Sequence, residues 1–283
     1  MNINETLIKG YDILKNVNIE SYIIDAQLLL CKVLNVEKLY IIMNRTEILS
    51  EDVEEKFFQL IDKRRKKMPM AYILGTVEFM GIELFVEEGV LIPRPDTETL
   101  VEECISITKE NNISNICDMC CGSGAIGISI AKYIEKCKLW LYDISPVALK
   151  VAEKNISSLQ LTERVSLCKS DLFEIPMKEN LKFNMIVSNP PYIREDIIPT
   201  LMEDVKDYEP HLALSGGGDG LNFYRRICSE GKDLLCPKGY MCFEIGHDQE
   251  KEVSNIMVEQ GFQHIYSIKD LGENYRVVIG RLP

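Results

Sequence analysis

The spacing of apolar residues in the first quarter of the chain is that of helices. Ile23, Ala26 and Leu30 recur three and four positions apart, which places them on one face of a helix. A second pattern of this kind ends before Pro69, because proline cannot continue a helix. These patterns predict a small all-helical domain over residues 1–75.

Short runs of β-like composition follow at residues 72–74, 77–79 and 84–86, and glycines separate them. We interpret residues 76–95 as a β-hairpin linker. The next helix follows directly, with Asp96 as its expected N-cap.

From residue 113 to the end of the chain, apolar runs with the length of strands alternate with helical patterns. Such alternation predicts a parallel sheet with helices on both faces, and it places ligands at the carboxyl ends of the strands. We therefore expect an α/β domain over residues 96–283. Its expected strands are 113–119, 139–142, 165–168, 183–188, 240–245, 264–268 and 275–279, and its expected helices include 125–133, 146–156, 221–235 and 249–259.

Composition narrows the class of protein. Of 283 residues, 46% are hydrophobic and 27% are charged, which is typical of a soluble globular protein. No apolar stretch is long enough to span a membrane. The N-terminus lacks the apolar core of a signal peptide, so we expect a cytoplasmic protein.

The net charge of −12 is distributed unevenly. Residues 1–75 hold 11 basic and 11 acidic side chains, so the acidic excess lies entirely in the rest of the chain. A large negative field opposes binding along a nucleic-acid backbone, and we expect no stable nucleic-acid or membrane partner. The basic run at residues 63–67 is most simply a solvated helix end, with a partner-docking patch as the alternative.

The ten cysteines do not indicate a metal site. Cys117 and Cys120 form a C-x-x-C motif, but a zinc site needs a second pair of ligands at suitable spacing, and none follows. His211, His247 and His264 also lack the spacing of metal ligands. We expect no bound metal.

A glycine-rich loop lies between an expected strand and an expected helix. Gly122, Gly124 and Gly127 form the pattern G-x-G-x-x-G, which also binds nicotinamide and flavin dinucleotides. Asp143 lies 19 residues after Gly124, at the end of the next strand. A carboxylate there accepts hydrogen bonds from both hydroxyls of a ribose.

Asp118 distinguishes between the possible cofactors of this loop. Its carboxylate lies directly before the loop, where it would repel a pyrophosphate placed at the helix N-terminus. S-adenosylmethionine has no phosphate and carries an ammonium and a sulfonium, so a nearby carboxylate favours it. A tight turn without any ligand is the simpler alternative, but it leaves Asp143 unexplained.

Two further residues after the third strand of the alternating region belong to the expected cofactor site. Asp171 is placed to accept the adenine amino group and Leu172 or Phe173 to pack on the ring, although such an aspartate is often only a helix N-cap. The complete set of expected cofactor contacts is Asp118, Met119, Cys120, Cys121, Gly122, Gly124, Asp143, Asp171, Leu172 and Asn189.

The sequence Asn189-Pro190-Pro191-Tyr192 follows the fourth strand, beside the expected methyl donor. Amide and aromatic amino nitrogens are poor nucleophiles because their lone pair is delocalised. The Asn189 side-chain oxygen and the Pro190 carbonyl are suitable acceptors for both N–H groups as charge develops on the nitrogen. The prolines hold these acceptors rigidly, and Tyr192 offers a flat face to a planar group. We expect Asn189, Pro190 and Tyr192 to act in catalysis and all four residues to bind the substrate, whereas a rigid turn explains the prolines alone.

With these motifs in place, the chain resembles the protein-(glutamine-N5) methyltransferases that act on class I peptide chain release factors. The segment Leu91-Ile92-Pro93-Arg94-Pro95-Asp96-Thr97-Glu98 and the helical N-terminal region make the resemblance specific, because the Asn-Pro-Pro-Tyr motif also occurs in DNA adenine-N6 methyltransferases. The resemblance covers nearly the whole chain and also includes residues 69–75, 118–124, 143–146, 170–174, 188–193, 209–214, 217–221 and 244–246. One departure is the pair Cys120 and Cys121, where the family usually has small Gly or Thr-type residues.

The resemblance implies a class I methyltransferase (Rossmann-like) fold with a mostly parallel seven-stranded sheet. It implies S-adenosylmethionine as methyl donor, S-adenosylhomocysteine as product, and the glutamine of a Gly-Gly-Gln motif as acceptor. It also implies that residues 1–75 help to dock the release factor. A DNA adenine-N6 methyltransferase and a non-catalytic protein that keeps the cofactor fold are the alternatives.

Overall fold

The structure is a computed structural model that describes residues 1–283. The chain divides into two compact units, which are described separately. The N-terminal unit comprises Met1–Thr76 and Met202–Tyr208, and the larger unit comprises Val77–Leu201 and Glu209–Pro283. A segment from the far half of the sequence therefore belongs to the N-terminal unit.

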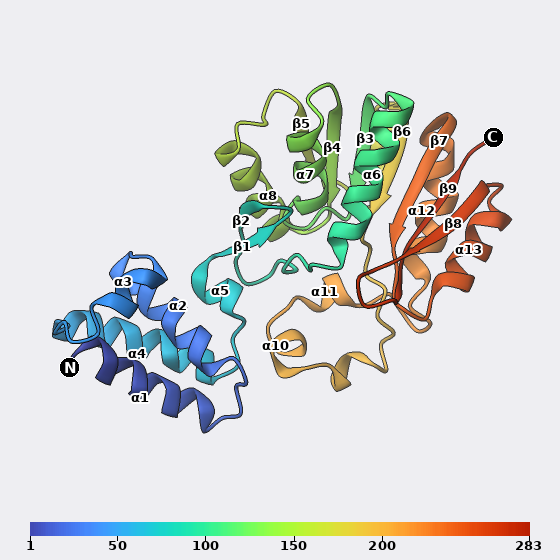
Figure 1. The fold of residues 1–283 in the computed structure, drawn as a ribbon. Coiled ribbons are helices and arrows are strands. Elements are labelled where there is room, and N and C mark those ends of the chain that lie inside the picture. The colour runs from blue at the N-terminus through green and yellow to red at the C-terminus, as the bar shows by residue number, and fades with distance from the viewer. The chain divides into compact units, whose positions relative to one another are not determined.

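The N-terminal unit is built from helices (Figure 1). Its core includes Leu29, Leu30 and Phe57, whose side chains are fully buried. Gly10 permits close approach of the first helix to Phe57, because a Cβ at this position would lie 2.8 Å from the phenyl ring. The helices are α1 (Ile3–Lys15), α2 (Tyr22–Leu34), α3 (Lys38–Met43), α4 (Glu51–Arg65), α5 (Met70–Leu74) and α10 (Glu203–Lys206).

The basic run at residues 63–67 lies at the end of α4, as expected for cations at a helix C-terminus. Two of its members also hold the unit together. Arg64 forms a 2.7 Å ion pair with the buried Asp25, and the Lys67 ammonium donates to the Val17 carbonyl at 2.6 Å. The run is thus partly a set of internal contacts rather than a wholly solvated helix end.

One predicted element is wrong. Residues 72–74 were expected to be β-like, but they belong to the short helix α5. Pro69 precedes its first residue, where the absent N–H costs nothing, and Gly75 ends it in the left-handed conformation with φ +80°. A helix of five residues is too short to display a helical period in the sequence.

The expected hairpin is formed by β1 (Thr76–Phe79) and β2 (Ile82–Phe85). Met80 and Gly81 both have positive φ, which matches the twist of a two-residue hairpin turn. Asn155 holds the end of the hairpin, because its side chain donates to the Phe85 carbonyl at 3.0 Å and accepts from the Phe85 amide at 2.7 Å.

The larger unit contains a seven-stranded sheet, which confirms the mostly parallel α/β fold. The strand order is β5-β4-β3-β6-β7-β9-β8, and only β9 runs antiparallel to its neighbours (Figure 1). The chain reverses its direction of winding between β3 and β6, which opens a crevice at the carboxyl ends of the strands. The strands are β3 (Asn115–Met119), β4 (Lys138–Asp143), β5 (Val165–Lys169), β6 (Phe183–Ser188), β7 (Leu235–Glu244), β8 (Gln263–Lys269) and β9 (Tyr275–Arg281).

Helices cover both faces of this sheet. Side chains of one strand alternate between two cores, so that Ile116 faces one core and Cys117 the other. The first core contains residues of α6 (Thr97–Asn111), α7 (Ala125–Tyr133) and α8 (Pro146–Ser158), and the second contains residues of α12 (Asn222–Gly231) and α13 (Glu250–Glu259). Short helices α9 (Glu174–Lys178) and α11 (His211–Leu214) complete this unit, together with 3₁₀ turns at Ile198–Thr200 and Lys232–Leu234.

Two details of this unit differ from prediction. Asp96 does not cap α6: its backbone is already helical, and its carboxylate forms a 3.1 Å ion pair with Arg276 of β9 instead. The helix expected to run to residue 235 ends at Gly231 and is followed by a 3₁₀ turn, after which β7 begins at Leu235. No helix of either unit combines the length and apolarity needed to cross a membrane.

Candidate functional site

A cavity of about 260 Å³ lies at the carboxyl ends of β3, β4 and β6, the point where the sheet reverses its winding. It belongs entirely to the larger unit. Nine of the expected site residues line it: Met119, Cys120, Cys121, Gly122, Asp143, Asp171, Leu172, Asn189 and Pro191. Asp118, Gly124, Pro190 and Tyr192 do not line it.

The loop after β3 lines the cavity, and three of its residues have left-handed backbone conformations. Cys120, Gly122 and Gly124 all have positive φ, at +62°, +55° and +81°. Cys121 is buried, and its amide donates to the Tyr142 carbonyl at 3.0 Å. Gly124 is the N-cap of α7, and a Cβ there would lie 2.8 Å from Ile128 in the next turn and 3.3 Å from Leu141 of β4, so a larger residue does not fit. The two cysteines are thus accommodated, with Cys120 in a conformation that favours glycine.

Asp143 ends β4 and faces this loop across the cavity. One carboxylate oxygen accepts from the Gly122 amide at 2.8 Å, and the other accepts from the Ser145 amide at 2.8 Å. Burial raises the pKa of Asp143, whereas these backbone hydrogen bonds oppose the rise. Each oxygen keeps a second lone pair, so the carboxylate can also accept two hydroxyls of a ribose.

Asp118 lies beneath the loop rather than in the cavity. It is fully buried, and one oxygen accepts from the Gly127 amide in the first turn of α7 at 2.8 Å. The other oxygen has no hydrogen-bond partner. Burial is the main reason that its pKa rises to about 7. Its charge therefore acts on a cavity ligand through the loop and not by contact.

Asp171 and Leu172 line the cavity beyond the end of β5. Asp171 does not cap α9 with its side chain, since it forms a 3.1 Å ion pair with Arg226 of α12. Leu172 is buried and has a positive φ of +44°. Arg226 and Phe223, from the same helix, also line the cavity, and no local motif indicated either of them.

The segment Asn189–Tyr192 is held from several sides. Ser188 donates its hydroxyl to the Met119 carbonyl at 2.6 Å, which ties the end of β6 to the cofactor loop. Gln249 donates to the Tyr192 carbonyl at 3.0 Å. Pro190 and Pro191 are buried, whereas Asn189 is partly exposed toward the cavity.

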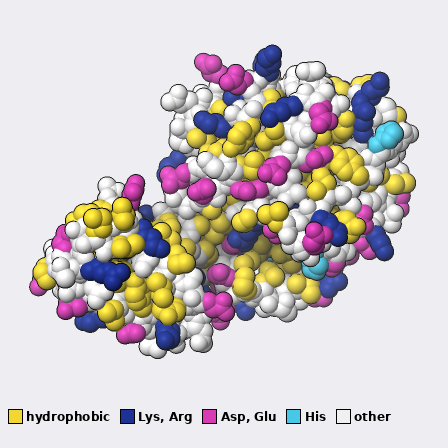
Figure 2. All heavy atoms as spheres, in the orientation of Figure 1, with side chains coloured by type: hydrophobic (Ala, Val, Ile, Leu, Met, Phe, Trp, Pro, Cys, Tyr) yellow, Lys and Arg dark blue, Asp and Glu magenta, His cyan; other side chains and the backbone are white.

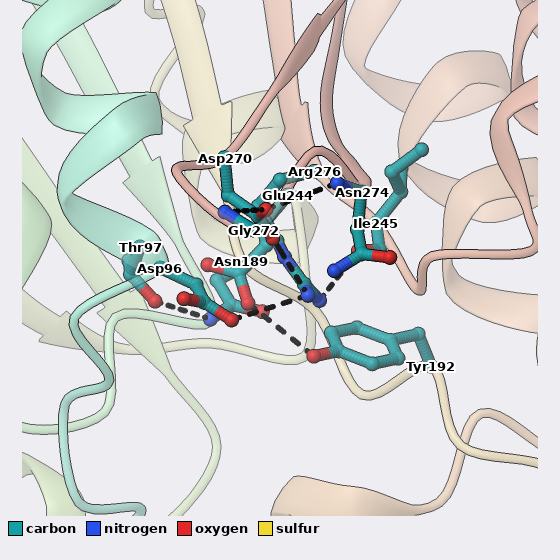
Figure 3. A network of polar contacts seen from close by, with 10 residues as sticks. All are labelled: Asp96, Thr97, Asn189, Tyr192, Glu244, Ile245, Asp270, Gly272, Asn274 and Arg276. Atoms are coloured by element: carbon teal, nitrogen blue, oxygen red, sulfur yellow. Dashed lines mark hydrogen bonds and ion pairs between the residues drawn. The ribbon is translucent and has the colours of Figure 1, made fainter.

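The side chains of Asn189 and Tyr192 join a polar network behind the cavity (Figure 3). The Asn189 amide donates to the Thr97 hydroxyl at 3.5 Å, and the Tyr192 hydroxyl donates to Glu244 Oε1 at 3.3 Å. Glu244 is buried at the end of β7, and burial raises its pKa to about 7. Arg276 lies next to it and pairs with Asp96 and Asp270 at 3.1 Å each. The tyrosine ring is thus fixed at its hydroxyl end.

The charged groups in and beneath the cavity favour a cofactor that is cationic and has no phosphate. Both arginines of the cavity are already paired with carboxylates, Arg226 with Asp171 and Arg94 with Glu209. Asp118 lies buried beneath the loop, and its ionised form adds negative potential there. These features oppose a pyrophosphate and suit a ligand that carries an ammonium and a sulfonium.

Two families match different parts of the chain. Residues 5–75 match the family described as the PrmC N-terminal domain, and residues 97–206 match the family described as the methyltransferase small domain.

Three relatives can be aligned over nearly the whole of this chain. Release factor glutamine methyltransferases of Clostridium acetobutylicum and Clostridium botulinum are each 49% identical over 99% of this chain, which spans 98% and 99% of their lengths. The release factor glutamine methyltransferase of Fusobacterium nucleatum is 40% identical over 96% of this chain and 77% of its own length.

Solved structures share the fold at low identity. A methyltransferase of Pyrococcus furiosus has a TM-score of 0.51 at 19% identity, covering 71% of this chain and 89% of its own. A 16S rRNA methyltransferase of T. thermophilus in complex with AdoMet and guanosine has a TM-score of 0.52 at 16% identity, covering 74% of this chain and 50% of its own.

Proposed function

This chain belongs to the family of release factor glutamine methyltransferases and is an S-adenosylmethionine-dependent methyltransferase, and we propose that its substrate is the Gly-Gly-Gln glutamine of class I peptide chain release factors. The methyl group goes to the side-chain amide nitrogen, N5. The observation that carries this proposal is the single cavity that joins Asp143, the expected ribose acceptor, to Asn189, the expected acceptor for the substrate amide.

We assign the part of the cavity around Asp143, Asp171 and Leu172 to the cofactor. S-adenosylmethionine, when bound, supplies an electrophilic methyl group attached to a sulfonium. The Asp143 carboxylate accepts the ribose hydroxyls, and the backbone of residues 120–122 approaches the methionyl part. Leu172 provides an apolar surface for the adenine ring. Asp171 keeps lone pairs for the adenine amino group beside its contact with Arg226.

The amide part of the site lies at Asn189 and Pro190. We assign the Asn189 oxygen and the Pro190 carbonyl as acceptors for the two amide N–H groups. Holding both hydrogens leaves the nitrogen lone pair directed at the methyl carbon. A nitrogen–carbon bond forms as the sulfur–carbon bond breaks, and one amide proton leaves to solvent. Tyr192, fixed by Glu244, offers its ring to the planar amide.

The N-terminal unit is assigned to substrate docking, as the resemblance implied. Figure 2 shows apolar side chains exposed on the surface of this unit. Leu39, Met43 and Ile48 are 62%, 74% and 74% exposed. Exposed apolar side chains of this size are typical of a protein–protein contact.

Transfer of a labelled methyl group tests the proposal. Purified protein and methyl-tritiated S-adenosylmethionine are incubated with a release factor, with the same factor carrying alanine in place of the Gly-Gly-Gln glutamine, and with adenine-containing DNA. We expect label only on the first. Asn189→Ala should lower turnover by roughly 10²–10³-fold, since one oriented acceptor accounts for about that much in rate. Label on DNA, or equal label on the glutamine-free factor, would refute the proposed substrate.

A further inference from the structure

The charged side chains that line the cavity are Arg94, Asp143, Asp171 and Arg226. S-adenosylmethionine has three charged groups: the sulfonium and the ammonium are positive, and the carboxylate of its methionyl part is negative. This carboxylate needs donors in the site, because an ion taken out of water without a partner is costly. Arginine is the side chain best matched to it, since the planar guanidinium fits both carboxylate oxygens.

Arg226 lies at the end of the cavity assigned to adenine. It forms a 3.1 Å ion pair with Asp171, which follows β5 and is next to Leu172. In the sheet, β5 is an edge strand, and β4 separates it from β3 and the loop that follows β3. The methionyl part is assigned to that loop. Arg226 is therefore at the opposite end of the cofactor from the carboxylate.

Arg94 lies on the side of the cavity formed by β3 and β6. It comes three residues before Thr97, whose hydroxyl is 3.5 Å from the Asn189 amide nitrogen. Asn189 follows β6, which pairs with β3 on the side away from β4. Arg94 is thus the arginine of the cavity that lies beside the methionyl part.

The position of Arg94 is restricted at its backbone and at its side chain. Pro93 and Pro95 flank it and limit the backbone conformations of the segment. Its Nη2 group donates to Oε1 of Glu209, whose side chain is 1% exposed. A guanidinium has five N–H donors, and a carboxylate engages two of them in a bidentate pair. Arg94, which is 38% exposed, therefore keeps donors for a ligand after it pairs with Glu209.

We propose that Arg94 binds the carboxylate of the methionyl part of S-adenosylmethionine, and that Glu209 positions the guanidinium for this contact. The inference rests on the assignment of the methionyl part to residues 120–122, which belongs to the proposed function. It does not depend on which molecule accepts the methyl group.

Arg94→Met tests the contact by calorimetry with two ligands. One is S-adenosylmethionine, and the other is its decarboxylated form, which keeps the adenosine, the sulfonium and the amine. We expect the variant to raise the Kd of S-adenosylmethionine by about 10- to 150-fold, the range of a lost charge-assisted hydrogen bond. The Kd of the decarboxylated form should stay within about twofold of the parental value, because the two changes remove the same contact.

Arg226→Met is the matched control, since it removes the other arginine of the cavity. It should change the Kd of both ligands by the same factor. Arg94→Met leaves the carboxylate of Glu209 buried without this partner, which is destabilising. The double variant Arg94→Met/Glu209→Gln removes that charge and should show the same difference between the two ligands as Arg94→Met.

Two results would overturn the inference. Equal weakening of both ligands in Arg94→Met and in the double variant would mean that Arg94 only shapes the cavity wall. An unchanged Kd for S-adenosylmethionine would assign its carboxylate to other groups, such as the backbone amides of the loop. Neither result bears on the acceptor, because the calorimetry contains no release factor, and labelled transfer to the Gly-Gly-Gln glutamine remains the separate test of the proposed substrate.

Discussion

The Asp143 carboxylate accepts the backbone amide of Gly122 at 2.8 Å, so the residue assigned to the ribose also holds the cofactor loop. This contact joins the ends of β3 and β4 across the cavity. Loss of the carboxylate should therefore weaken cofactor binding in two ways. The ribose hydroxyls lose their acceptor, and the loop loses a contact that holds it in place.

Asp143→Ala should weaken S-adenosylmethionine binding by about 10- to 150-fold, because a charge-assisted hydrogen bond contributes about 1.5–3 kcal/mol. Calorimetry with S-adenosylmethionine measures the change. Glu273→Ala, at an exposed carboxylate in the turn between β8 and β9, is the matched control and should bind as the parent does. Unchanged affinity of Asp143→Ala would remove this residue from the site.

Asp118 should make the stability of the protein depend on pH. Burial raises its pKa from 3.8 to about 7, so the folded state binds the proton more tightly than the unfolded state. The resulting stabilisation is complete below pH 3.8 and is lost as the pH rises through about 7. Asn at this position does not titrate, and its amide still accepts from Gly127.

Urea unfolding of parent and Asp118→Asn at pH 5 and pH 8 measures this effect. We expect the variant to gain free energy of unfolding relative to the parent on going to pH 8, by a few kcal/mol at most, since each pKa unit is worth about 1.4 kcal/mol. A difference that stays constant between the two pH values would mean that Asp118 has the same pKa in both states.

The regular elements of the fold were predictable from sequence because each strand carries its own apolar run. The central strands β3 and β6 are buried on both faces, so their side chains are mostly apolar. The loop glycines and Asp143 were equally visible, since a turn that needs positive φ restricts the residue types locally. Asn189 and the two prolines were recognisable as a motif.

The contacts that orient the site were not predictable in this way. Asp96 pairs with Arg276, and Asp171 with Arg226, across 180 and 55 positions in the sequence. No local period encodes such a pairing, because it depends on how β9 and α12 lie beside the sheet. Glu244 was visible only as part of a shared motif, and its burial became evident only when β7 was placed beside β6.

Turnover should rise with pH through the titration of Glu244. Burial raises its pKa to about 7, and the ionised carboxylate is the stronger acceptor for the Tyr192 hydroxyl, which fixes the tyrosine ring beside the substrate. The other charged or titratable groups that face it are Asp96, Tyr224 and Arg276, of which Arg276 lowers this pKa and Asp96 raises it. We expect kcat to increase between about pH 6 and pH 8.

The pH profile of Glu244→Gln provides the comparison. This variant has no group to titrate at position 244, so the rise in kcat near pH 7 should be absent. Measurements with saturating release factor and S-adenosylmethionine separate kcat from binding. The same rise in both proteins would assign it to another group.

The exposed apolar side chains of α3 should determine how the protein substrate binds. Leu39 and Met43 lie four positions apart on this helix and are 62% and 74% exposed. Replacing both with glutamate would place two charges in the interface proposed for the release factor. We expect kcat/KM for an intact release factor to fall at least tenfold, mainly through KM, because side chains at the centre of an interface often contribute about 2 kcal/mol or more each.

The matched control is Val258→Glu, at a 61% exposed apolar residue of α13 in the larger unit. It adds a charge of the same sign at a position outside the proposed docking surface and should leave KM unchanged. Affinity for S-adenosylmethionine should stay at the parental value in both proteins, since all cavity residues lie beyond position 88. If Leu39→Glu/Met43→Glu keeps the parental KM, the α3 surface does not contact the release factor. Equal losses in both variants would assign the effect to added negative charge rather than to a specific contact.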